Sequence, residues 1–588
     1  MKVPKSKIVW EHFLLHLSSF SLALFVFYCV IFAANLLGIP FYLGYKRFIM
    51  NIVVFSAMAD RVIWASSMSL FLISFIIQYF RGEFNWRGIL PLSLFYGMLI
   101  LMGIEIASFS RWVYNLFFPS PVFANESWHI AFTETQITNI LYPILPAILM
   151  FFSYSWIGEF TFKGLLTKKE ESKKENANNA YLHYFNSSKI SIIIIASSVI
   201  AALFIGHYNH AAAAPHNQAF PGVDVPYYVR KLDYMLNSTS IEALSYASKD
   251  DRFLYLVLQY LCFLVTGSSP KSFVAYSMPI VLTFLLMLST FFLVKVGRSL
   301  LHASTAMLVT VFSFQVTVGI YAGFFANWFA LTFVYIFYGL LMIIMKGHRH
   351  PSLLLLAGLT SAAVLYVHPW TWILLVMMIL AAYIVTTLML VWIRKADLHS
   401  YIWELKFLAA LFAVNVLMFY VKGFIGVGSG AALVDGYVNT KRLEPSLLNA
   451  FRLRYFLDRT FNWYVGGFYA SPPMIILAIL GVLSFLDYND RYNRLLLNWM
   501  LVASAMLFVD FPWQSRFLYL TPFNIYVALG ILFGAEQLSR FFESKSQKHI
   551  ATLAFWIFYA LTILFLLNYA VRCVTIKQFG PTGLTTAP

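Results

Sequence analysis

The chain has 588 residues, of which 60% are apolar and 11% are charged, and its mean hydropathy is +0.74. Soluble globular proteins contain about 45–50% apolar and about 25% charged residues, so the composition excludes a soluble protein and indicates a multi-pass membrane protein. The formal charge of +16 comes from lysines and arginines scattered over many short loops, which argues against a nucleic-acid partner and is typical of residues that set membrane topology.

The N-terminal quarter of the chain is predicted to form four membrane spans. A span needs about 20 mostly apolar residues, and loops rich in lysine and arginine face the cytoplasm. Lys2, Lys5 and Lys7 therefore place the N-terminus inside. The first apolar stretch lacks a small-residue cleavage site, so we expect it to remain as a span and not to be removed as a signal peptide. The expected spans lie near 14–37, 62–80, 89–109 and 136–158.

A polar, lysine-rich segment after the fourth span marks the predicted domain boundary. The N-terminal bundle covers 1–165 and is a candidate contact region for a partner protein or for lipid. A cytoplasmic linker follows over 166–189, because a charged segment of low hydrophobicity does not form a packed core. The main transmembrane module covers 190–534, and residues 535–588 form a loop, a last span and a tail.

The loops of the main module alternate between two sides of the membrane. A fifth span over 190–207 leads to an external loop over 208–252. An external position of 208–252 is compatible with a cytoplasmic position of the later basic loops only if 252–265 does not cross the bilayer. We therefore expect an interfacial helix at 252–265. The sequence predicts about fifteen spans in total. The basic loops expected inside are 346–350, 393–397, 487–494 and 539–549, and the segments expected outside are 368–372, 423–470 and 511–516.

The external loop over 208–252 holds the main candidate for chemistry. It contains the run Asp224-Val-Pro226-Tyr227-Tyr228-Val-Arg230. Polar groups at membrane depth are costly, so their gathering on one side of the membrane suggests a functional site. Asp224 lies between Pro221-Gly222 and Pro226, and a turn residue that satisfies local backbone groups is the alternative interpretation. The competing acid is Asp233, which is expected on a helix as a partner of Arg230 or Lys231.

Two stretches carry a resemblance to a known superfamily. The first is a span followed by this acidic loop and by the segment Arg252-Phe-Leu-Tyr-Leu-Val-Leu-Gln-Tyr-Leu. The second is the late span that begins Arg516-Phe-Leu-Tyr-Leu-Thr-Pro522. Over residues 190 to 534 the chain resembles the GT-C superfamily of integral membrane glycosyltransferases, such as protein mannosyltransferases and aminoarabinose transferases. The resemblance implies an all-α, GT-C-like fold with interfacial helices in the first large external loop.

The resemblance also implies a reaction. Such enzymes move a sugar from a polyprenyl-phosphate carrier to an acceptor on the extracytoplasmic face, with inversion and without a covalent intermediate. Asp224 would be the general base that accepts the proton of the acceptor hydroxyl. Arginines would stabilise the leaving phosphate, because their forked donors match phosphate oxygens. The candidates for this role are Arg516, Arg230, Arg452, Arg454 and Lys441.

Other residues have two interpretations each. Tyr227 and Tyr228 are candidates to contact substrate, or they are interfacial aromatic residues. Arg516 could alternatively anchor its span at the outer headgroups. Arg452 and Arg454 lie in a basic amphipathic segment of the 423–470 loop, which would bind either lipid phosphate or the bilayer surface. His368, in His-Pro-Trp-Thr-Trp, is a candidate donor to the lipid phosphate or a cap at a helix end broken by proline.

The sequence predicts no required cofactor. His207, His210 and His216 precede Asp224 and form a weak candidate for a divalent metal site, because no second set of ligands is placed near them. The three cysteines, Cys29, Cys262 and Cys573, have no paired spacing that would suggest a disulfide or a zinc site.

The predicted function is therefore a GT-C-type glycosyltransferase in a cell envelope, with a polyprenyl-phosphate sugar as donor and a glycan, lipid or protein as acceptor. The plasma membrane of a prokaryote is favoured over the endoplasmic reticulum. Alternatives are a transporter or flippase for lipid-linked sugars, a non-catalytic scaffold subunit with the same fold, and an oligosaccharyltransferase-like enzyme. The last is disfavoured because Asn462-Trp463-Tyr464 is only a faint match to the Trp-Trp-Asp motif of that group, and because no acid lies between Tyr321 and Trp328.

Overall fold

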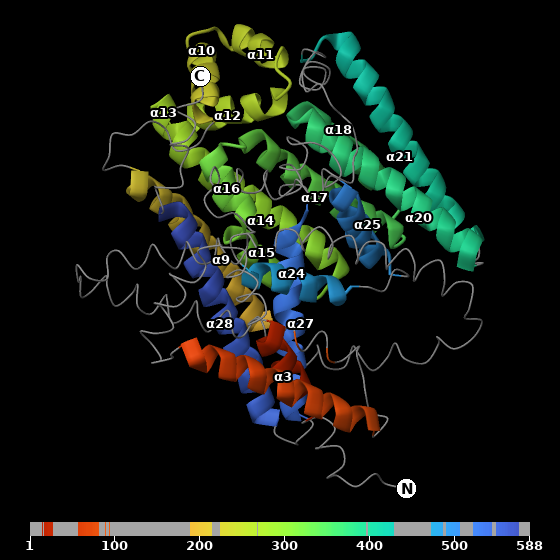
Figure 1. Cartoon of the computed structure of the whole chain (residues 1–588). Coiled ribbons are helices and arrows are strands. Elements are labelled where there is room, and N and C mark those ends of the chain that lie inside the picture. Colours follow the sequence, from red (N-terminus) through yellow and green to blue (C-terminus); the bar gives the residue numbers. More distant parts are fainter. Residues whose placement is uncertain are drawn as a thin grey trace. The chain divides into compact units, whose positions relative to one another are not determined.

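The structure, a computed structural model, describes a subset of the chain, and every regular element in this subset is a helix (Figure 1). The predicted all-α class is therefore confirmed for these residues. The described residues are 14–15, 17–26, 57–80, 89, 93, 188–213, 224–266, 269–394, 398–428, 472–485, 490–505, 521–543 and 548–575.

The chain forms two compact units, each built from several segments. Unit 1 contains Met1–Ile144, Gly466–Ser484 and Tyr526–Tyr569. Unit 2 contains Leu145–Val465, Phe485–Ile525 and Ala570–Pro588. The predicted boundaries at 165, 189 and 534 stay predictions, and the predicted linker over 166–189 lies almost entirely outside the described residues.

Unit 1 includes α3 (Ala57–Phe80), α24 (Pro472–Leu483) and most of α27 (Phe523–Glu543) and α28 (Lys548–Thr575). The helices α24 and α27 meet at two glycines. A Cβ atom on Gly481 would overlap the carbonyl oxygen of Tyr526, and a Cβ atom on Gly530 would overlap that of Leu477. Small residues at such a crossing allow two membrane helices to approach closely enough for backbone contact.

Unit 2 carries most of the described helices, and α17 lies in its interior. Most residues of α17 (Phe325–Met345) are buried, and this helix packs against both α14 and α18. The other helices of this unit are α9 (Ser188–Ala213), α10 (Val225–Leu236), α11 (Ser240–Ser248), α12 (Phe253–Thr266), α13 (Pro270–Ser272), η2 (Phe273–Ser277), α14 (Met278–Gly297), α15 (Leu300–Val311), α16 (Phe314–Ala322), α18 (Pro351–Val367), α19 (Pro369–Thr371), η3 (Trp372–Met377), α20 (Met378–Arg394), α21 (Leu398–Ile425) and α25 (Arg491–Ala505).

Six helices in the described part of the chain are long and apolar enough to cross a membrane. The protein is thus an integral membrane protein by helix length and composition. The predicted total of about fifteen spans stays a prediction, because most of 89–109 and all of 136–158 lie outside the described residues. The six are Pro270–Gly297, Leu300–Thr317, Phe325–Met345, Pro369–Trp392, Tyr401–Ile425 and His549–Leu567.

The segment expected to be interfacial forms the short helix α12. It has 14 residues, which is fewer than the roughly 20 needed to cross a bilayer. Together with α10 and α11 it forms a small group of helices at one end of unit 2 (Figure 1). The side chain of Gln259 in α12 donates to the backbone carbonyl of Tyr228 in α10 at 3.1 Å, which fixes these two helices to each other.

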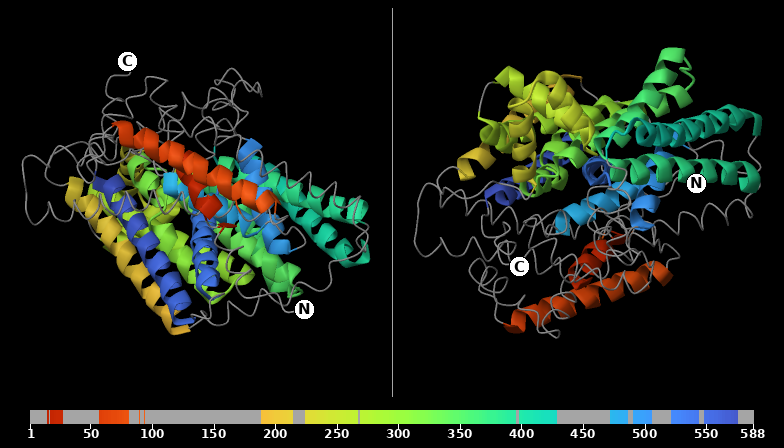
Figure 2. Two further views of the ribbon diagram at one scale, coloured as in Figure 1. Left: turned by 60° about the horizontal axis from the view of Figure 1, so that its bottom comes forward. Right: turned by 90° about the horizontal axis from the view of Figure 1, so that it is seen from above.

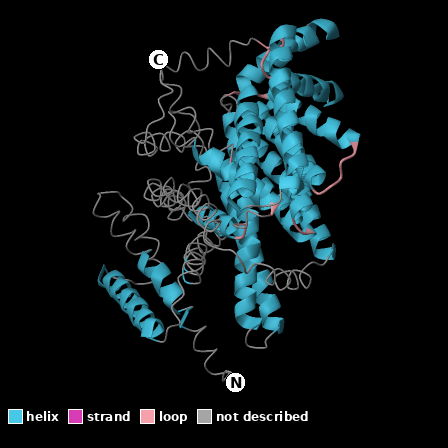
Figure 3. Ribbon diagram, turned by 90° about the vertical axis from the view of Figure 1, so that its right-hand side faces the viewer, coloured by secondary structure: helices cyan, strands magenta, loops and turns pink. Residues whose placement is uncertain are grey.

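Two of the candidate spans begin in the same way. Ser269 and His368 each accept a hydrogen bond from the backbone N–H three residues later, and each is followed by proline at the first helical position. Proline suits this position because its fixed φ angle is helical and its missing N–H would have no partner there. A π-helical stretch then follows in each, η2 in the first and η3 in the second. All of these elements are drawn as helix in Figure 3.

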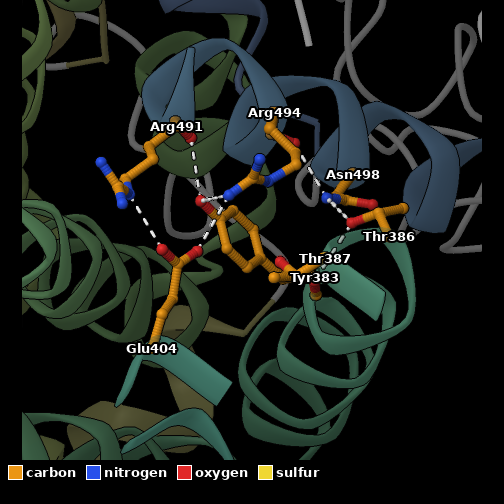
Figure 4. A network of polar contacts seen from close by, with 7 residues as sticks. All are labelled: Tyr383, Thr386, Thr387, Glu404, Arg491, Arg494 and Asn498. Atoms are coloured by element: carbon orange, nitrogen blue, oxygen red, sulfur yellow. Dashed lines mark hydrogen bonds and ion pairs between the residues drawn. The ribbon is translucent and has the colours of Figure 1, made fainter. Parts of the chain in front are cut away.

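Helices α20 and α21 lie side by side in both Figures 1 and 2, and α25 packs against α20. A buried ionic network joins the three (Figure 4). Glu404 of α21 binds Arg491 at 2.8 Å and Arg494 at 2.9 Å, both from α25. The hydroxyl of Tyr383 in α20 accepts a hydrogen bond from Arg494 at 3.2 Å. Because the Arg494 side chain is fully buried, its charge depends on Glu404 for compensation.

Candidate functional site

Asp224 stands at the N-terminus of α10. Its backbone carbonyl accepts hydrogen bonds from the N–H groups of Tyr227 at 3.1 Å and Tyr228 at 3.3 Å, which starts the helix. Its side chain makes no capping hydrogen bond to this helix. The side chain is 33% exposed. The helix therefore begins without a capping hydrogen bond from the carboxylate.

A glycine of another helix allows the start of α10 to approach closely. Gly323, after α16, has a φ angle of +69°, a left-handed conformation that favours glycine. A Cβ atom there would lie 3.1 Å from the backbone nitrogens of both Asp224 and Val225. The backbone of the acid is thus packed against the loop that leads into α17.

Tyr228 lies one helical turn after Asp224 and is buried. Its ring stacks on Phe325 at a centroid distance of 5.5 Å and meets Tyr255 edge-on at 4.8 Å. Its hydroxyl accepts hydrogen bonds from the Arg252 guanidinium at 2.8 Å and from the backbone N–H of Ala326 at 3.4 Å. Tyr228, predicted to contact substrate, therefore contacts protein groups in this structure.

Asp250 is a carboxylate that the protein itself saturates with donors. It accepts hydrogen bonds from the Tyr227 hydroxyl at 2.5 Å and from the backbone N–H of Arg252 at 2.9 Å, and it pairs with Lys231 at 3.1 Å. Burial opposes ionisation of Asp250, but these donors outweigh it and hold the pKa of Asp250 below its usual value. Burial and the bond to Asp250 raise the pKa of Tyr227. Tyr227 and Lys231 are thus used to hold the turn before α12 against α10.

Arg252 contacts both the candidate acid Asp224 and the two tyrosines that follow it. Its guanidinium lies 3.7 Å from the Asp224 carboxylate and over the rings of Tyr227 and Tyr228, with centroid distances of 4.9 and 5.3 Å. Burial disfavours its charged form, but the neighbouring Tyr228 and Asp224 outweigh this and raise the pKa of Arg252. The guanidinium is a permanent cation at the candidate acid.

Asp251 lies between Asp250 and Arg252 and connects the turn before α12 to α21. Its carboxylate pairs with Lys422 at 3.6 Å. Burial raises the pKa of Asp251 although the Lys422 cation opposes this effect. The backbone N–H of Gly428, just after α21, donates to the carbonyl of Ser248 at 2.8 Å. The three consecutive residues Asp250, Asp251 and Arg252 therefore contact α10, α21 and Asp224 respectively.

Arg230 is not brought to Asp224 by the structure. It is exposed, and its side chain donates to the carbonyl of Pro226 in its own helix at 3.4 Å. Lys231 pairs with Asp250 and not with Asp233, which is exposed. The remaining predicted phosphate-binding residues, Arg516, Arg452, Arg454 and Lys441, lie outside the described residues.

His368 is buried and acts as a helix cap. Its Nδ1 atom accepts the N–H of Thr371 at 3.2 Å and lies 2.9 Å from the hydroxyl of the same residue. This is the capping role that the sequence left open, and a role towards a lipid phosphate stays a prediction. His207 and His210 lie on α9 with side chains that the structure does not describe, and His216 lies outside the described residues. Within the described residues no group of three His, Cys, Asp or Glu side chains has a geometry suited to a metal ion.

Sequence reasoning missed Arg252 and Asp250 as members of the site. A signal for both was present, because Asp250-Asp251-Arg252 is a charged triplet directly before an apolar helix within the same external loop. Nothing in the sequence, however, shows which of these charges turns towards α10. The interaction joins residues 28 positions apart across a helix, a loop, a second helix and a turn.

No family model and no curated protein matches the chain. Among solved structures it is similar to the archaeal oligosaccharyltransferase AglB from Archaeoglobus fulgidus. In complex with an inhibitory peptide and a dolichol-phosphate, that enzyme matches with 12% sequence identity and a TM-score of 0.43, over 66% of this chain and 56% of that chain. The apo form of the Archaeoglobus fulgidus oligosaccharyltransferase matches with 12% identity and a TM-score of 0.44, over 67% of this chain and 57% of that chain.

Both neighbours are oligosaccharyltransferases by name. The matched region is little more than half of their length. The identity and the TM-scores are low, so donor, acceptor and catalytic residues have to be inferred from the side chains of this chain.

Proposed function

We propose that this protein is a GT-C-type membrane glycosyltransferase that transfers a sugar from a polyprenyl-phosphate donor to an acceptor hydroxyl on the extracytoplasmic face. The observation that carries the proposal is the pairing of Asp224 with Arg252 in the loop that precedes the candidate span Pro270–Gly297. This carboxylate does not cap its helix, it is partly exposed, and a guanidinium lies 3.7 Å away. A partly exposed acid held at the start of a helix is suited to accept a proton from a bound hydroxyl.

The proposed reaction is a single displacement at the anomeric carbon. The acceptor oxygen forms the new bond to this carbon, while its proton passes to the Asp224 carboxylate. The bond between the anomeric carbon and the phosphate oxygen breaks, and the polyprenyl phosphate leaves with the electron pair. In this proposal the carboxylate accepts the proton directly, and no metal ion takes part in the proton transfer.

The leaving phosphate carries negative charge and requires cations. Arg516, Arg452, Arg454 and Lys441 are proposed for this role because they belong to segments expected on the same side of the membrane as Asp224. Arg230 is a further candidate, since its exposed guanidinium is free of any ion pair recorded within the described residues.

The first prediction concerns Asp224→Asn. Membranes that contain equal amounts of folded wild type or variant are incubated with a radiolabelled polyprenyl-phosphate monosaccharide, and transfer to endogenous acceptors is measured. An amide cannot accept the proton, so we expect transfer to fall by about a hundredfold or more. Asp233→Asn is the matched comparison, because Asp233 is exposed on the same helix about 180° around its axis from position 224.

Normal transfer by Asp224→Asn, or loss of transfer in Asp233→Asn, would contradict the assignment of the base. If the wild type transfers no monosaccharide but transfers an oligosaccharide from a lipid-linked donor to an asparagine-containing peptide, the oligosaccharyltransferase alternative replaces the proposal. If the wild type binds the lipid and transfers nothing, a flippase or a scaffold subunit explains the fold better.

A further inference from the structure

The side chain of Arg252 is held in place from several directions. Its backbone N–H is bound to Asp250 at 2.9 Å, and its guanidinium donates to the Tyr228 hydroxyl at 2.8 Å. The flat guanidinium lies over the ring of Tyr227 and over that of Tyr228. Arginine suits such a place because its planar group stacks on aromatic rings and still donates hydrogen bonds in the ring plane.

Tyr227 and Tyr228, which contact Arg252, are fixed by contacts of their own. Tyr228 is fixed by burial against Phe325 and Tyr255. Tyr227 is fixed by its bond to Asp250, which also pairs with Lys231. The guanidinium therefore has little freedom, and the group towards which it is directed and which is still partly exposed is the Asp224 carboxylate. The titratable and charged groups that interact with Arg252 include Tyr228, Asp224, Tyr227, Asp250, Asp251 and Tyr255.

We infer that Arg252 is the positioning residue of Asp224, and that its guanidinium keeps the carboxylate aimed at the acceptor while Tyr228 and Asp250 keep the guanidinium itself in place. This inference rests on the proposed function. It differs from a role in binding the donor phosphate, because Nη1 of the guanidinium donates to the Tyr228 hydroxyl at 2.8 Å and lies 3.7 Å from the Asp224 carboxylate. A positioning role affects the chemical step, whereas loss of a phosphate contact weakens donor binding.

The kinetic test compares Arg252→Gln, Arg252→Lys and the control Lys249→Gln, which removes an exposed cation from the same segment. We expect Arg252→Gln to lower kcat by about tenfold to a hundredfold with little change in KM for the donor, because a misplaced catalytic group costs rate and not affinity. Arg252→Lys keeps the charge and should recover part of the rate. Lys249→Gln should match the wild type.

The double variant Asp224→Asn/Arg252→Gln separates a positioning role from an independent one. If Arg252 acts through Asp224, the double variant is no slower than Asp224→Asn alone, because the two changes remove the same function. Multiplied losses in the double variant, or a rise in donor KM with unchanged kcat in Arg252→Gln, would overturn the inference in favour of direct phosphate binding.

A second measurement does not depend on sugar transfer. Purified protein in detergent is treated with a water-soluble carbodiimide and an amine at pH 5.5, and labelling of Asp224 is followed by peptide mass spectrometry. The reagent attacks protonated carboxyl groups, and a nearby cation disfavours protonation. Labelling of Asp224 should be several-fold faster in Arg252→Gln than in the wild type or in Lys249→Gln. Equal rates would refute the inference even if the wild type proves to be an active transferase, and a faster rate would support the pairing even if the proposed function fails.

Discussion

At the scale of single residues, Asp224 and Asp250 belong to one loop but differ in their surroundings, and we assign them different roles for that reason. Asp250 accepts three donors and is a structural anion. The Asp224 carboxylate is partly exposed, lies 3.7 Å from the Arg252 guanidinium and does not cap its helix. A carboxylate saturated by fixed donors is a poor proton acceptor, so the less buried acid is the better candidate for a base.

Asp250 should contribute to stability in a manner that depends on pH. Its folded-state pKa lies below the usual value of 3.8, so the contribution is present above about pH 4 and is lost as the pH falls through the folded value. We expect Asp250→Asn to lower the free energy of unfolding at pH 7 by about 1–3 kcal/mol, since the amide lacks the negative charge that pairs with Lys231 and keeps only one of the two acceptor oxygens. Thermal unfolding in detergent measures the effect.

The same unfolding measurement repeated between pH 5 and pH 3 provides the check on Asp250. The wild type should lose more stability than Asp250→Asn over this interval, because the variant has no carboxylate to protonate at that position. Asp233→Asn, at an exposed acid of the neighbouring helix, should follow the wild type. Parallel curves for wild type and Asp250→Asn would contradict the assigned role.

The sequence proposed Asp224 as the catalytic base and Arg230 as a phosphate-binding residue, and it named no partner for the Asp224 carboxylate. On a helix, residues three or four apart lie on one face, so Tyr227 and Tyr228 lie near Asp224, whereas Arg230, six residues on, points elsewhere. Arg252 reaches Asp224 through the packing of α12 on α10. Local periodicity cannot predict such a contact, because it depends on how two helices fold back on each other.

At the scale of secondary-structure elements, the ionic network in Figure 4 makes α20, α21 and α25 one structural group. Glu404 compensates two arginines, of which Arg494 is fully buried and Arg491 is 41% exposed. Asn498 of α25 adds a hydrogen bond to the Thr386 hydroxyl of α20 at 3.0 Å. The sequence placed Arg491 and Arg494 in a cytoplasmic loop because they are basic, and it gave no sign that they would pair with α21.

Glu404→Gln should destabilise this group far more than Arg491→Gln. The first change leaves the buried Arg494 without its counter-ion, which typically costs about 3–5 kcal/mol. The second removes a partly exposed partner, for which about 0–1 kcal/mol is expected. Thermal unfolding of both variants in the same detergent tests the order, and a loss in Arg491→Gln as large as that in Glu404→Gln would show that burial does not govern the network.

At the scale of the whole molecule, the alternation of loops in the main module stays a prediction, and the lengths of three helices bear on it. Three candidate spans, Pro270–Gly297, Leu300–Thr317 and Phe325–Met345, separate the Asp224 loop from the basic turn at 346–350. An odd number of crossings places these two segments on opposite sides of a membrane. The prediction requires that α12 does not cross, and with 14 residues it is short for a span.

Single cysteines introduced in a variant without Cys29, Cys262 and Cys573 test this topology. Ser240→Cys, at the start of α11, should react in intact spheroplasts with a maleimide that cannot cross the membrane. His348→Cys, in the basic turn, should react only after the membrane is permeabilised. Both positions are exposed, so accessibility within the protein does not limit the reaction. Labelling of both from the outside would contradict the predicted arrangement.

The π-helical stretch η3 has a consequence for the helix that follows it. A π turn accommodates one residue more than an α turn, and each residue of an α-helix advances the side-chain direction by about 100°. The direction in which Tyr383 and Thr386 face α25 therefore depends on one additional residue between Trp372 and Met377. If a homologue lacked one residue in that stretch, α20 would be rotated and would present a different face to Arg494 and Asn498. A sequence alignment of such a homologue with this chain should place a single-residue gap between Trp372 and Met377 and not in the loops on either side.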